Sequence, residues 1–323
     1  MTKKALVTGG AGFIGSHVAE LYLSRGYDVT VIDNLSSGKR ANLADGVTFH
    51  ELDITSPEAA QVVRDGKFDV VSHLAAQIDV RKSVNDPAYD ANVNIGGTLN
   101  LLEAVRQGGA KTRFIFSSTG GAIYGDFVQP PNEETFAKDP ESPYGIAKLA
   151  AEYYMAYYGR IHKLDTVALR YANVYGPRQD PHGEAGVVAI FCNRLLDGRA
   201  LTVFGDGRQT RDYVFVKDVA RANLAAAEGT LPPVERLDAR GFNVGTAIET
   251  DVNELAAILT KVSGASSPTE YAPARAGEQL RSAVKIEKAR NVLGWQPQVG
   301  LEEGLAETYR FFAERRKGAA ATA

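Results

Sequence analysis

Short apolar runs alternate with helical patterns through the first half of the chain. Runs rich in Val, Ile, Leu and Phe predict strands, and between them apolar residues recur at helical spacing. Continuous apolar strands separated by helices are typical of a parallel sheet that is covered on both faces. The sequence therefore predicts an α/β fold with a doubly wound parallel sheet. Its strands are expected near residues 4–8, 28–33, 47–51, 68–73, 112–118 and 164–170.

The regular alternation ends near Asn173, and this change marks a second, smaller α/β lobe. A chain of 323 residues exceeds one average domain, so one large domain with a smaller lobe is the natural expectation. The small-residue segment 317–323 is expected to be a disordered tail.

The bulk composition excludes several classes of protein. A formal charge of −3 gives no general attraction for nucleic acid or membranes, so a phosphate site must concentrate arginine locally. Cys192 is the single cysteine and lies in an apolar helical run, which predicts a buried, unreactive thiol. No apolar run approaches the ~20 residues of a membrane span, and no signal peptide precedes the first strand, so we expect a cytoplasmic protein. No metal site is expected, because partners at metal-ligand spacing are missing for His17, His50, His162 and His182.

Three glycines spaced three residues apart, Gly9, Gly12 and Gly15, follow the first strand and open a helical pattern. Such glycines let the backbone turn tightly against a pyrophosphate, and the free N–H groups of the helix start hold the anion. The second strand ends in Asp33, where a carboxylate accepts hydrogen bonds from ribose hydroxyls and repels a 2′-phosphate. NAD is therefore favoured over NADP, although Lys39 and Arg40 follow closely enough to serve a 2′-phosphate.

Tyr144 and Lys148 stand four residues apart in a helical pattern, about one turn, and so share one face. A phenol with its ordinary pKa of about 10 is a poor base at neutral pH. A neighbouring ammonium, together with a cationic nicotinamide ring, favours the phenolate and lowers that pKa. Moving it to around 7 requires roughly 4 kcal/mol of differential stabilisation. The pair is thus the candidate for a general base and its electrostatic partner.

The glycine triplet and Tyr-x-x-x-Lys together resemble the signature of the short-chain dehydrogenase/reductase superfamily. From residue 3 to about 312 the chain is similar to its extended branch, and in particular to nucleotide-sugar 4-epimerases of the UDP-glucose 4-epimerase family. The segments that carry the similarity are 33–38, 73–77, 116–125, 169–178, 204–207 and 210–213. The resemblance implies an isomerase that inverts C4 of a UDP-hexose through a 4-keto intermediate with bound NAD.

The same resemblance implies a division of labour along the chain. Residues 1–173 with about 212–245 would form a Rossmann domain that binds NAD, and 174–211 with 246–316 a nucleotide-sugar-binding lobe. Beside the glycines and Asp33, the residues implied for the cofactor are Phe13, Ile14, Asn34, Ser36, Gly38, Asp53, Ile54, Leu74, Ala75, Ala76, Gln77, Asn92, Ser117, Tyr144, Lys148 and Tyr171.

For the reaction, the resemblance implies that Tyr144 is the base, that Lys148 assists it and anchors a ribose, and that Thr119 bonds the sugar 4-oxygen. Counting back from Tyr124 instead selects Ser118, so both hydroxyls stay candidates. The residues implied for the UDP-sugar are Thr119, Tyr144, Asn173, Val188, Val203, Phe204, Arg211, Arg275, Glu278 and Ser282.

Within that set, Arg211 and Arg275 match the two arginines that clamp the diphosphate, and planar donor forks suit phosphate oxygens. Glu278 matches an acid that touches the nucleoside ribose. Ser282 falls where a bulky side chain excludes an N-acetyl group at C2, so its small side chain leads to the hypothesis that UDP-GlcNAc is accepted.

Rival functions stay open. A 4,6-dehydratase would place an Asp-Glu pair after Thr119, where this chain has Gly120 and Gly121. A UDP-glucuronate 4-epimerase would need a cation for the C6 carboxylate, for which Arg81 and Arg178 are the candidates. A non-catalytic NAD(H)-binding regulator would be expected to lack the tyrosine–lysine pair.

A homodimer is also expected by resemblance, because family members pair the helices that correspond here to residues 88–107 and 144–161 across a two-fold axis. Both stretches carry apolar or aromatic residues on more than one side, which include Tyr153, Tyr154, Tyr157 and Tyr158. The alternative is that these tyrosines pack inside a monomer.

Overall fold

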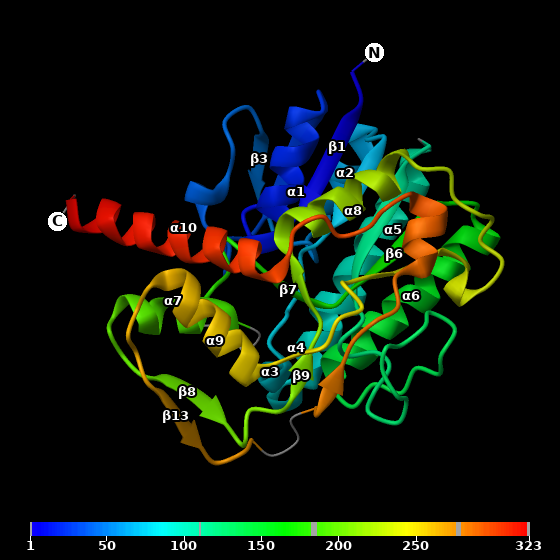
Figure 1. Ribbon diagram of the computed structural model, residues 1–323. Coiled ribbons are helices and arrows are strands. Elements are labelled where there is room, and N and C mark those ends of the chain that lie inside the picture. Colours follow the sequence, from blue (N-terminus) through cyan, green and yellow to red (C-terminus); the bar gives the residue numbers. More distant parts are fainter. Residues whose placement is uncertain (1, 110, 182–185, 276–278, 322–323) are drawn as a thin grey trace.

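The computed structural model describes residues 2–109, 111–181, 186–275 and 279–321, and is built on a seven-stranded parallel sheet (Figure 1). The order across the sheet is β11-β6-β5-β4-β1-β2-β3, so the sheet reverses its direction of growth between β1 and β4. The doubly wound fold is confirmed, as are all the expected strands, to within two residues at each end. The bounds are β1 Lys4–Thr8, β2 Asp28–Asp33, β3 Thr48–Glu51, β4 Val70–His73, β5 Arg113–Thr119, β6 Asp165–Tyr171 and β11 Gly241–Val244.

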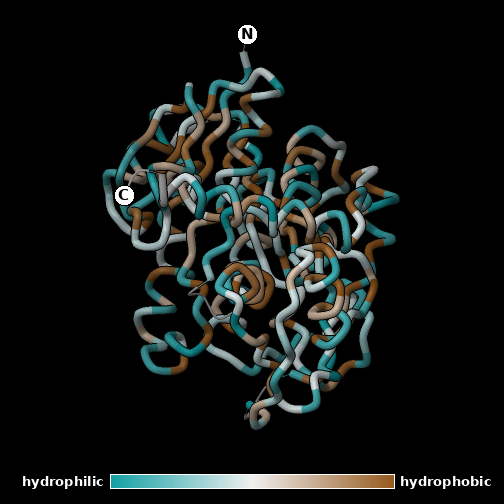
Figure 2. The backbone as a smooth tube through the Cα atoms, turned by 60° about the vertical axis from the view of Figure 1, so that its left-hand side comes forward, coloured by the Kyte–Doolittle hydropathy of each residue, from teal (hydrophilic) through white to brown (hydrophobic). Residues whose placement is uncertain are grey.

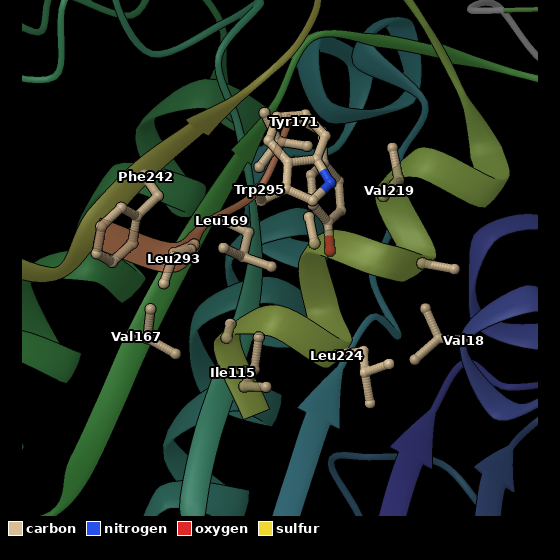
Figure 3. Packing of buried hydrophobic residues seen from close by; sticks show 14 of the residues in the cluster. Val18, Ile115, Val167, Leu169, Tyr171, Val219, Leu224, Phe242, Leu293 and Trp295 are labelled. Atoms are coloured by element: carbon tan, nitrogen blue, oxygen red, sulfur yellow. The ribbon is translucent and has the colours of Figure 1, made fainter. Parts of the chain in front are cut away.

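Helices cover both faces of this sheet. Alternate residues of β5 point to opposite sides, so Ile115 joins the cluster under α1 (Phe13–Ser24) and α8 (Val216–Glu228). Figure 3 shows Ile115, Val167 and Leu169 on the sheet beside Val219 and Leu224 of α8. Phe114 and Phe116 pack on the other side, against α2 (Pro57–Gly66), α5 (Gly97–Gly108) and α6 (Pro143–Ile161).

Six further helices of the described residues are only three to six residues long. Brown and teal residues alternate along the helices in Figure 2, as expected for helices with one buried face. The short helices are η1 Arg40–Asn42, α3 Val80–Asn85, α4 Pro87–Ala91, the π-helix η2 Asn92–Gly96, η3 Leu237–Arg240 and the π-helix η4 Ala289–Leu293. The single helix expected over 88–107 is thus α4, η2 and α5 in succession.

A second core belongs to the smaller lobe, where α7, α9, β8 and β13 group together below α10 (Figure 1). Phe13 and Ile14, in the first turn of α1, pack against this cluster and join the two lobes. The bounds are β7 Asn173–Tyr175, α7 Val187–Leu196, β8 Leu201–Phe204, β9 Thr210–Arg211, β10 Tyr213–Phe215, β12 Thr250–Asp251, α9 Val252–Ser263, β13 Thr269–Ala272, β14 Arg281–Ser282 and α10 Leu301–Ala321.

Two expectations about the chain's organisation differ from the structure. Ile286, Ala289, Leu293 and Trp295 pack in the core of the first lobe, although the segment 246–316 was assigned whole to the second. The helix α10 is assigned as far as Ala321 and so includes residues 317–321, where a disordered tail was expected. The high helix propensity of alanine agrees with this extension. In the described part of the chain, no helix has the length and apolar character needed to cross a membrane.

Candidate active site

The glycine loop between β1 and α1 has the shape of an anion-binding cradle. Gly9 adopts φ +70°, and a Cβ there would lie 2.7 Å from the Ala75 nitrogen. A Cβ on Gly15 would lie 2.1 Å from the Gly9 carbonyl oxygen, so α1 can approach β1 only with glycine at this position. Gly12 is the N-cap of α1 and offers no side-chain cap, which leaves the first N–H groups for a ligand. The backbone of this loop is therefore shaped as an anion site at a helix start requires.

Asp33 is buried where β2 ends and lies against this loop. Its carboxylate accepts hydrogen bonds from the backbone N–H groups of Ala11, at 3.0 Å, and Leu35, at 2.8 Å. Burial raises the pKa of Asp33, against the effect of those two bonds. A Cβ on Gly38 would come within 2.7 Å of an Asp33 oxygen, so the backbone closes tightly over the carboxylate.

The two cationic side chains that follow Asp33 differ in whether they are already paired, and so in whether they could bind a 2′-phosphate. Arg40 is paired with Glu51 at 2.5 Å and stacks on the Phe49 ring, whereas the side chain of Lys39 points into solvent. Asn34 donates to Asp53 at 2.8 Å and so joins the ends of β2 and β3. Hydrogen bonds from Thr55 and Asn34 outweigh burial and lower the pKa of Asp53. Ile54 is buried and Ser36 is exposed.

Tyr144 and Lys148 lie on one face of α6, as predicted. Ser142 caps the helix by accepting from the Gly145 N–H at 3.1 Å. The Lys148 Nζ atom donates to the Ser117 carbonyl at 2.9 Å and lies 5.8 Å from the centre of the Tyr144 ring. Burial lowers the pKa of Lys148 to about 8, against the attraction of Asp90 and Glu152.

The lowered pKa expected for Tyr144 is not found in the protein alone. Burial raises the pKa of this phenol, and the negative charge of Asp90 raises it further. Desolvation disfavours the phenolate, and the expected lowering included the positive charge of a nicotinamide ring, which the protein alone does not supply. Ionisation of the phenol near neutral pH therefore stays a prediction for the cofactor-loaded site.

Ser118 and Thr119 end β5 and differ in what their side chains contact. The Ser118 hydroxyl is buried and donates to Glu152 at 2.5 Å, so it is committed to the interior and does not suit the role of the catalytic hydroxyl. Around Gly121, a Cβ would lie 3.9 Å from the Thr119 hydroxyl, 3.8 Å from Asn173 Oδ1 and 3.8 Å from the Ser282 hydroxyl. Three of the expected substrate residues thus converge on one small space.

Behind this space lies a charged network that the sequence analysis missed. The Arg170 guanidinium is fully buried and donates to Glu152 at 2.7 Å, to Asp238 at 2.7 Å and to the Tyr124 hydroxyl at 3.1 Å. Glu152 lies one turn after Lys148 on α6, so the network ties α6 to β5 and β6. Burial of an arginine cannot be read from hydropathy, because charged residues are almost always exposed.

A second missed group organises the loop after β4. Asn94 accepts from the Gln77 backbone N–H at 3.0 Å and donates to the Gln77 carbonyl at 3.0 Å. The Gln77 amide donates to Asp90 at 2.9 Å and to the Asp79 carbonyl, and accepts from the Asp79 N–H at 2.7 Å. The Gln77 side chain is thus satisfied internally and does not suit the expected cofactor role. Asn92 is exposed, whereas Asn94 is buried.

The described part of the smaller lobe contains most of the residues expected for the nucleotide. Ser282 and Arg211 are direct partners across β14 and β9, and Ser282 is 3% exposed. The Arg275 guanidinium covers the Phe204 ring at 3.8 Å from its centre. Glu278 lies outside the described residues.

Three expected ligand residues have their side chains in the cores instead. Val188 and Val203 are fully buried in the cluster of the smaller lobe, so burial leaves no side-chain surface for a substrate. Tyr171 points into the first-lobe cluster near Trp295 (Figure 3), and its hydroxyl accepts from Asn223 at 2.8 Å. Its backbone carbonyl accepts from the Gly120 N–H at 2.7 Å and so holds the Thr119 loop.

Comparisons with known proteins agree with this geometry. Residues 5–245 match the NAD dependent epimerase/dehydratase family. The chain is 44% identical over 317 residues to the UDP-glucose 4-epimerase of Mycolicibacterium smegmatis, and the match covers 97% of this chain and 99% of that protein.

Two solved structures are similar over nearly their whole length. The UDP-glucose 4-epimerase of Thermotoga maritima with UDP-glucose has a TM-score of 0.91 and 48% identity, and the match covers 97% of this chain and 99% of that one. The UDP-glucose 4-epimerase of Thermus thermophilus in complex with NAD has a TM-score of 0.87 and 44% identity, with 96% and 99% covered.

Proposed function

The chain belongs to the NAD dependent epimerase/dehydratase family, and we propose that it catalyses the reversible C4 epimerisation of UDP-glucose and UDP-galactose. The observation that carries this proposal is the joint occurrence of the glycine cradle, the Tyr144–Lys148 pair and the convergence of Thr119, Asn173 and Ser282. Relatives with this activity match nearly the full chain, which supports the same assignment.

The residues around the glycine loop fit NAD. The pyrophosphate would lie over Gly9, Gly12 and the start of α1, and the adenosine ribose against Asp33. When bound there, NAD supplies the hydride acceptor and donor of the reaction. The buried Asp33 carboxylate and the pairing of Arg40 with Glu51 favour NAD over NADP.

We assign Tyr144 as the general base that takes the proton from the sugar 4-hydroxyl and returns it to the 4-oxygen of the inverted sugar. Thr119 holds that oxygen through its hydroxyl. Lys148 holds the end of β5 through the Ser117 carbonyl, and its ammonium provides positive charge near the phenol.

The space after Thr119 favours simple oxidation and reduction over water loss. A dehydratase needs an acid and a base there. A Cβ on Gly120 would lie 2.8 Å from a Val284 methyl, so even the smallest side chain at this position would displace its neighbours. The alternative function of a 4,6-dehydratase is disfavoured accordingly.

The UDP-glucuronate alternative needs a cation near C6 of the sugar. Arg178 is paired with Glu20 of α1 and is only 19% exposed, so it is engaged elsewhere. Arg81 lies on α3 and is exposed. A neutral hexose therefore suits the site better than a uronic acid.

For the nucleotide end, we propose that Arg211 and Arg275 bind the diphosphate, with Phe204 against the uracil and Asn173 near the sugar. The guanidinium of Arg275 must then leave the Phe204 ring as the base arrives. The small buried side chain of Ser282 leaves room at C2 of the sugar, and on this basis we propose that UDP-GlcNAc is also a substrate.

We also propose a homodimer. Ile146, Tyr153, Tyr157 and Ile161 are between 44% and 61% exposed, and the last three follow one another at four-residue intervals along α6. Tyr158, by contrast, packs inward and donates to Glu103 at 2.5 Å. Sedimentation at micromolar concentration is expected to give twice the mass of the chain, and a monomer mass would contradict the proposal.

One experiment tests the function. The purified protein is incubated with UDP-glucose, UDP-GlcNAc or UDP-glucuronate, without added cofactor, and the epimers are separated. We expect conversion of the first two and none of the third. The variant Tyr144→Phe is expected to retain NAD and to lose turnover, whereas an unchanged rate would remove Tyr144 from the mechanism.

A further inference from the structure

Asp90 is a buried carboxylate close to the candidate base, and one of its oxygens has no partner among the described residues. It is 1% exposed and lies near the end of α4, which packs against α6. Its Oδ1 atom accepts from the Gln77 amide at 2.9 Å and from the Asn94 amide at 3.0 Å. Its Oδ2 atom is buried and accepts no hydrogen bond from a described residue. A buried charge left half satisfied is costly, so its presence beside the candidate base calls for an explanation.

The natural counter-charge for this carboxylate is the Lys148 ammonium, which is 2% exposed. The other carboxylate near Lys148 is Glu152, and the Arg170 guanidinium already neutralises it through bonds of 2.7 to 3.2 Å. Asp90 is thus the buried anion left to balance Lys148. Its charge also acts on Tyr144, where it opposes ionisation of the phenol.

We propose that Asp90 is a positioning residue that sets the charge of the Tyr144–Lys148 site, an inference that rests on the proposed function. With one oxygen it fixes the β4 loop through Gln77 and Asn94. With its charge it keeps the empty site neutral and the phenol protonated. The site therefore becomes basic only when a cationic ring enters beside Tyr144, so that proton removal is tied to the loaded state.

Few other ionisable groups face the pair from the elements packed around it. His73 on β4 is buried and bonded to two threonines, and Ser83 is the buried polar residue of α3. Of the other charged or phenolic groups on these elements, Arg81, Lys82, Asp86 and Tyr89 are exposed, and Asp79 accepts from the Lys82 N–H at the start of α3. Glu103 is paired with Arg106 and Tyr158, and Arg170 with Glu152 and Asp238.

The test is the pH dependence of kcat/KM for UDP-glucose in the NAD-loaded protein. Removing the anion in Asp90→Asn lowers the pKa of Tyr144, so the ascending limb is expected to move by about one unit toward lower pH. Asp90→Glu keeps the negative charge, so the ascending limb of its pH profile is expected at the same pH as in the parent protein. Asp86→Asn removes an exposed carboxylate from the N-cap of the same helix and is the matched control, with no shift expected.

The proposal is overturned if the ascending limb of the pH profile does not move in an active Asp90→Asn protein. It is also overturned if the limb moves equally in Asp86→Asn. If Asp90→Asn does not fold, Asp90→Ser removes the same charge and admits water beside Gln77. A second readout needs no substrate: tyrosinate absorbance is titrated in NAD-loaded protein, and the corresponding Tyr144→Phe protein is subtracted. Should the parent protein epimerise no UDP-hexose, the proposed function fails, and this titration still decides whether Asp90 governs Tyr144.

Discussion

Arg170 binds Glu152 through two nitrogen atoms, with N–O distances of 2.7 to 3.2 Å, and neither side chain is more than 2% exposed. Glu152 comes from α6, which carries the candidate base, and Arg170 comes from β6. The pair also holds the Ser118 hydroxyl at 2.5 Å, next to Thr119. One buried ion pair therefore fixes the positions of α6 and β5, the two elements that carry the candidate catalytic residues.

The variant Glu152→Gln is expected to lower the free energy of unfolding by about 3 kcal/mol, because it leaves a buried guanidinium without its main counter-charge. Urea unfolding measures the change. Glu307→Gln breaks the exposed pair with Lys217 at 2.7 Å and serves as the control, with an expected loss below ~1 kcal/mol. Equal losses in the two variants would mean that the buried pair has no special weight.

Ser118 and Thr119 are expected to respond differently to removal of the hydroxyl. Thr119→Ala should lower kcat by roughly 10²-fold or more with little change in stability, because its hydroxyl is placed to bond the reacting oxygen. Ser118→Ala should lower stability by about 1 kcal/mol and retain most of kcat, since its partner is Glu152. Steady-state kinetics and urea unfolding on both proteins separate the roles, and the reverse pattern would select Ser118 as the catalytic hydroxyl.

Most strands were predictable because they contain short apolar runs, and a parallel sheet then brings the loops after β1, β2, β4 and β5 to one edge. The glycine loop, Asp33 and the Tyr144–Lys148 face follow from local spacing alone. Contacts such as Asp90 with Gln77, or Arg170 with Glu152, join residues of different elements, and nothing in local spacing signals them. The raised pKa of Tyr144 in the protein alone could not be predicted for the same reason, because desolvation depends on burial.

Asn92 and Asn94 show a second limit of the sequence. Residues Asn92–Gly96 form a π-helix, which no residue pattern in the sequence signals. Asn92, which the resemblance implies for the cofactor, has an exposed side chain, whereas Asn94 is buried and accepts from the Gln77 N–H of the loop after β4.

The small side chain of Ser282 predicts the range of sugars. Ser282→Tyr is expected to lower the rate with UDP-GlcNAc relative to UDP-glucose by about tenfold or more, because the phenol would fill the space shared with Thr119 and Asn173. The ratio of kcat/KM for the two substrates is the measurement. Arg281→Tyr is the control, since the neighbouring Arg281 is exposed and paired with Glu249 outside this space. An unchanged ratio in Ser282→Tyr would remove Ser282 from sugar selection.

The burial and hydrogen bonds of the His73 imidazole lead to a prediction of how stability depends on pH. The Thr98 hydroxyl donates to the Asn94 carbonyl at 2.6 Å, so it accepts from His73 Nε2 at 3.0 Å, and Nδ1 is left to accept from Thr8 at 2.7 Å. Neutral imidazole satisfies every group, whereas a second proton would face the Thr8 hydroxyl. Burial, with a smaller contribution from Lys148, lowers the pKa of His73 to about 3.

Between pH 6.5 and about 3 the unfolded chain thus binds a proton at this histidine that the folded chain does not. Stability supplied by the neutral ring is complete above pH 6.5 and falls on acidification, by on the order of 1.4 kcal/mol per pH unit. Urea unfolding from pH 7 to 5 should show about 2 kcal/mol less loss in His73→Gln than in the parent protein. His162→Gln, at an exposed position, should lose as much as the parent. Parallel curves for all three proteins would show that His73 takes up no proton on unfolding.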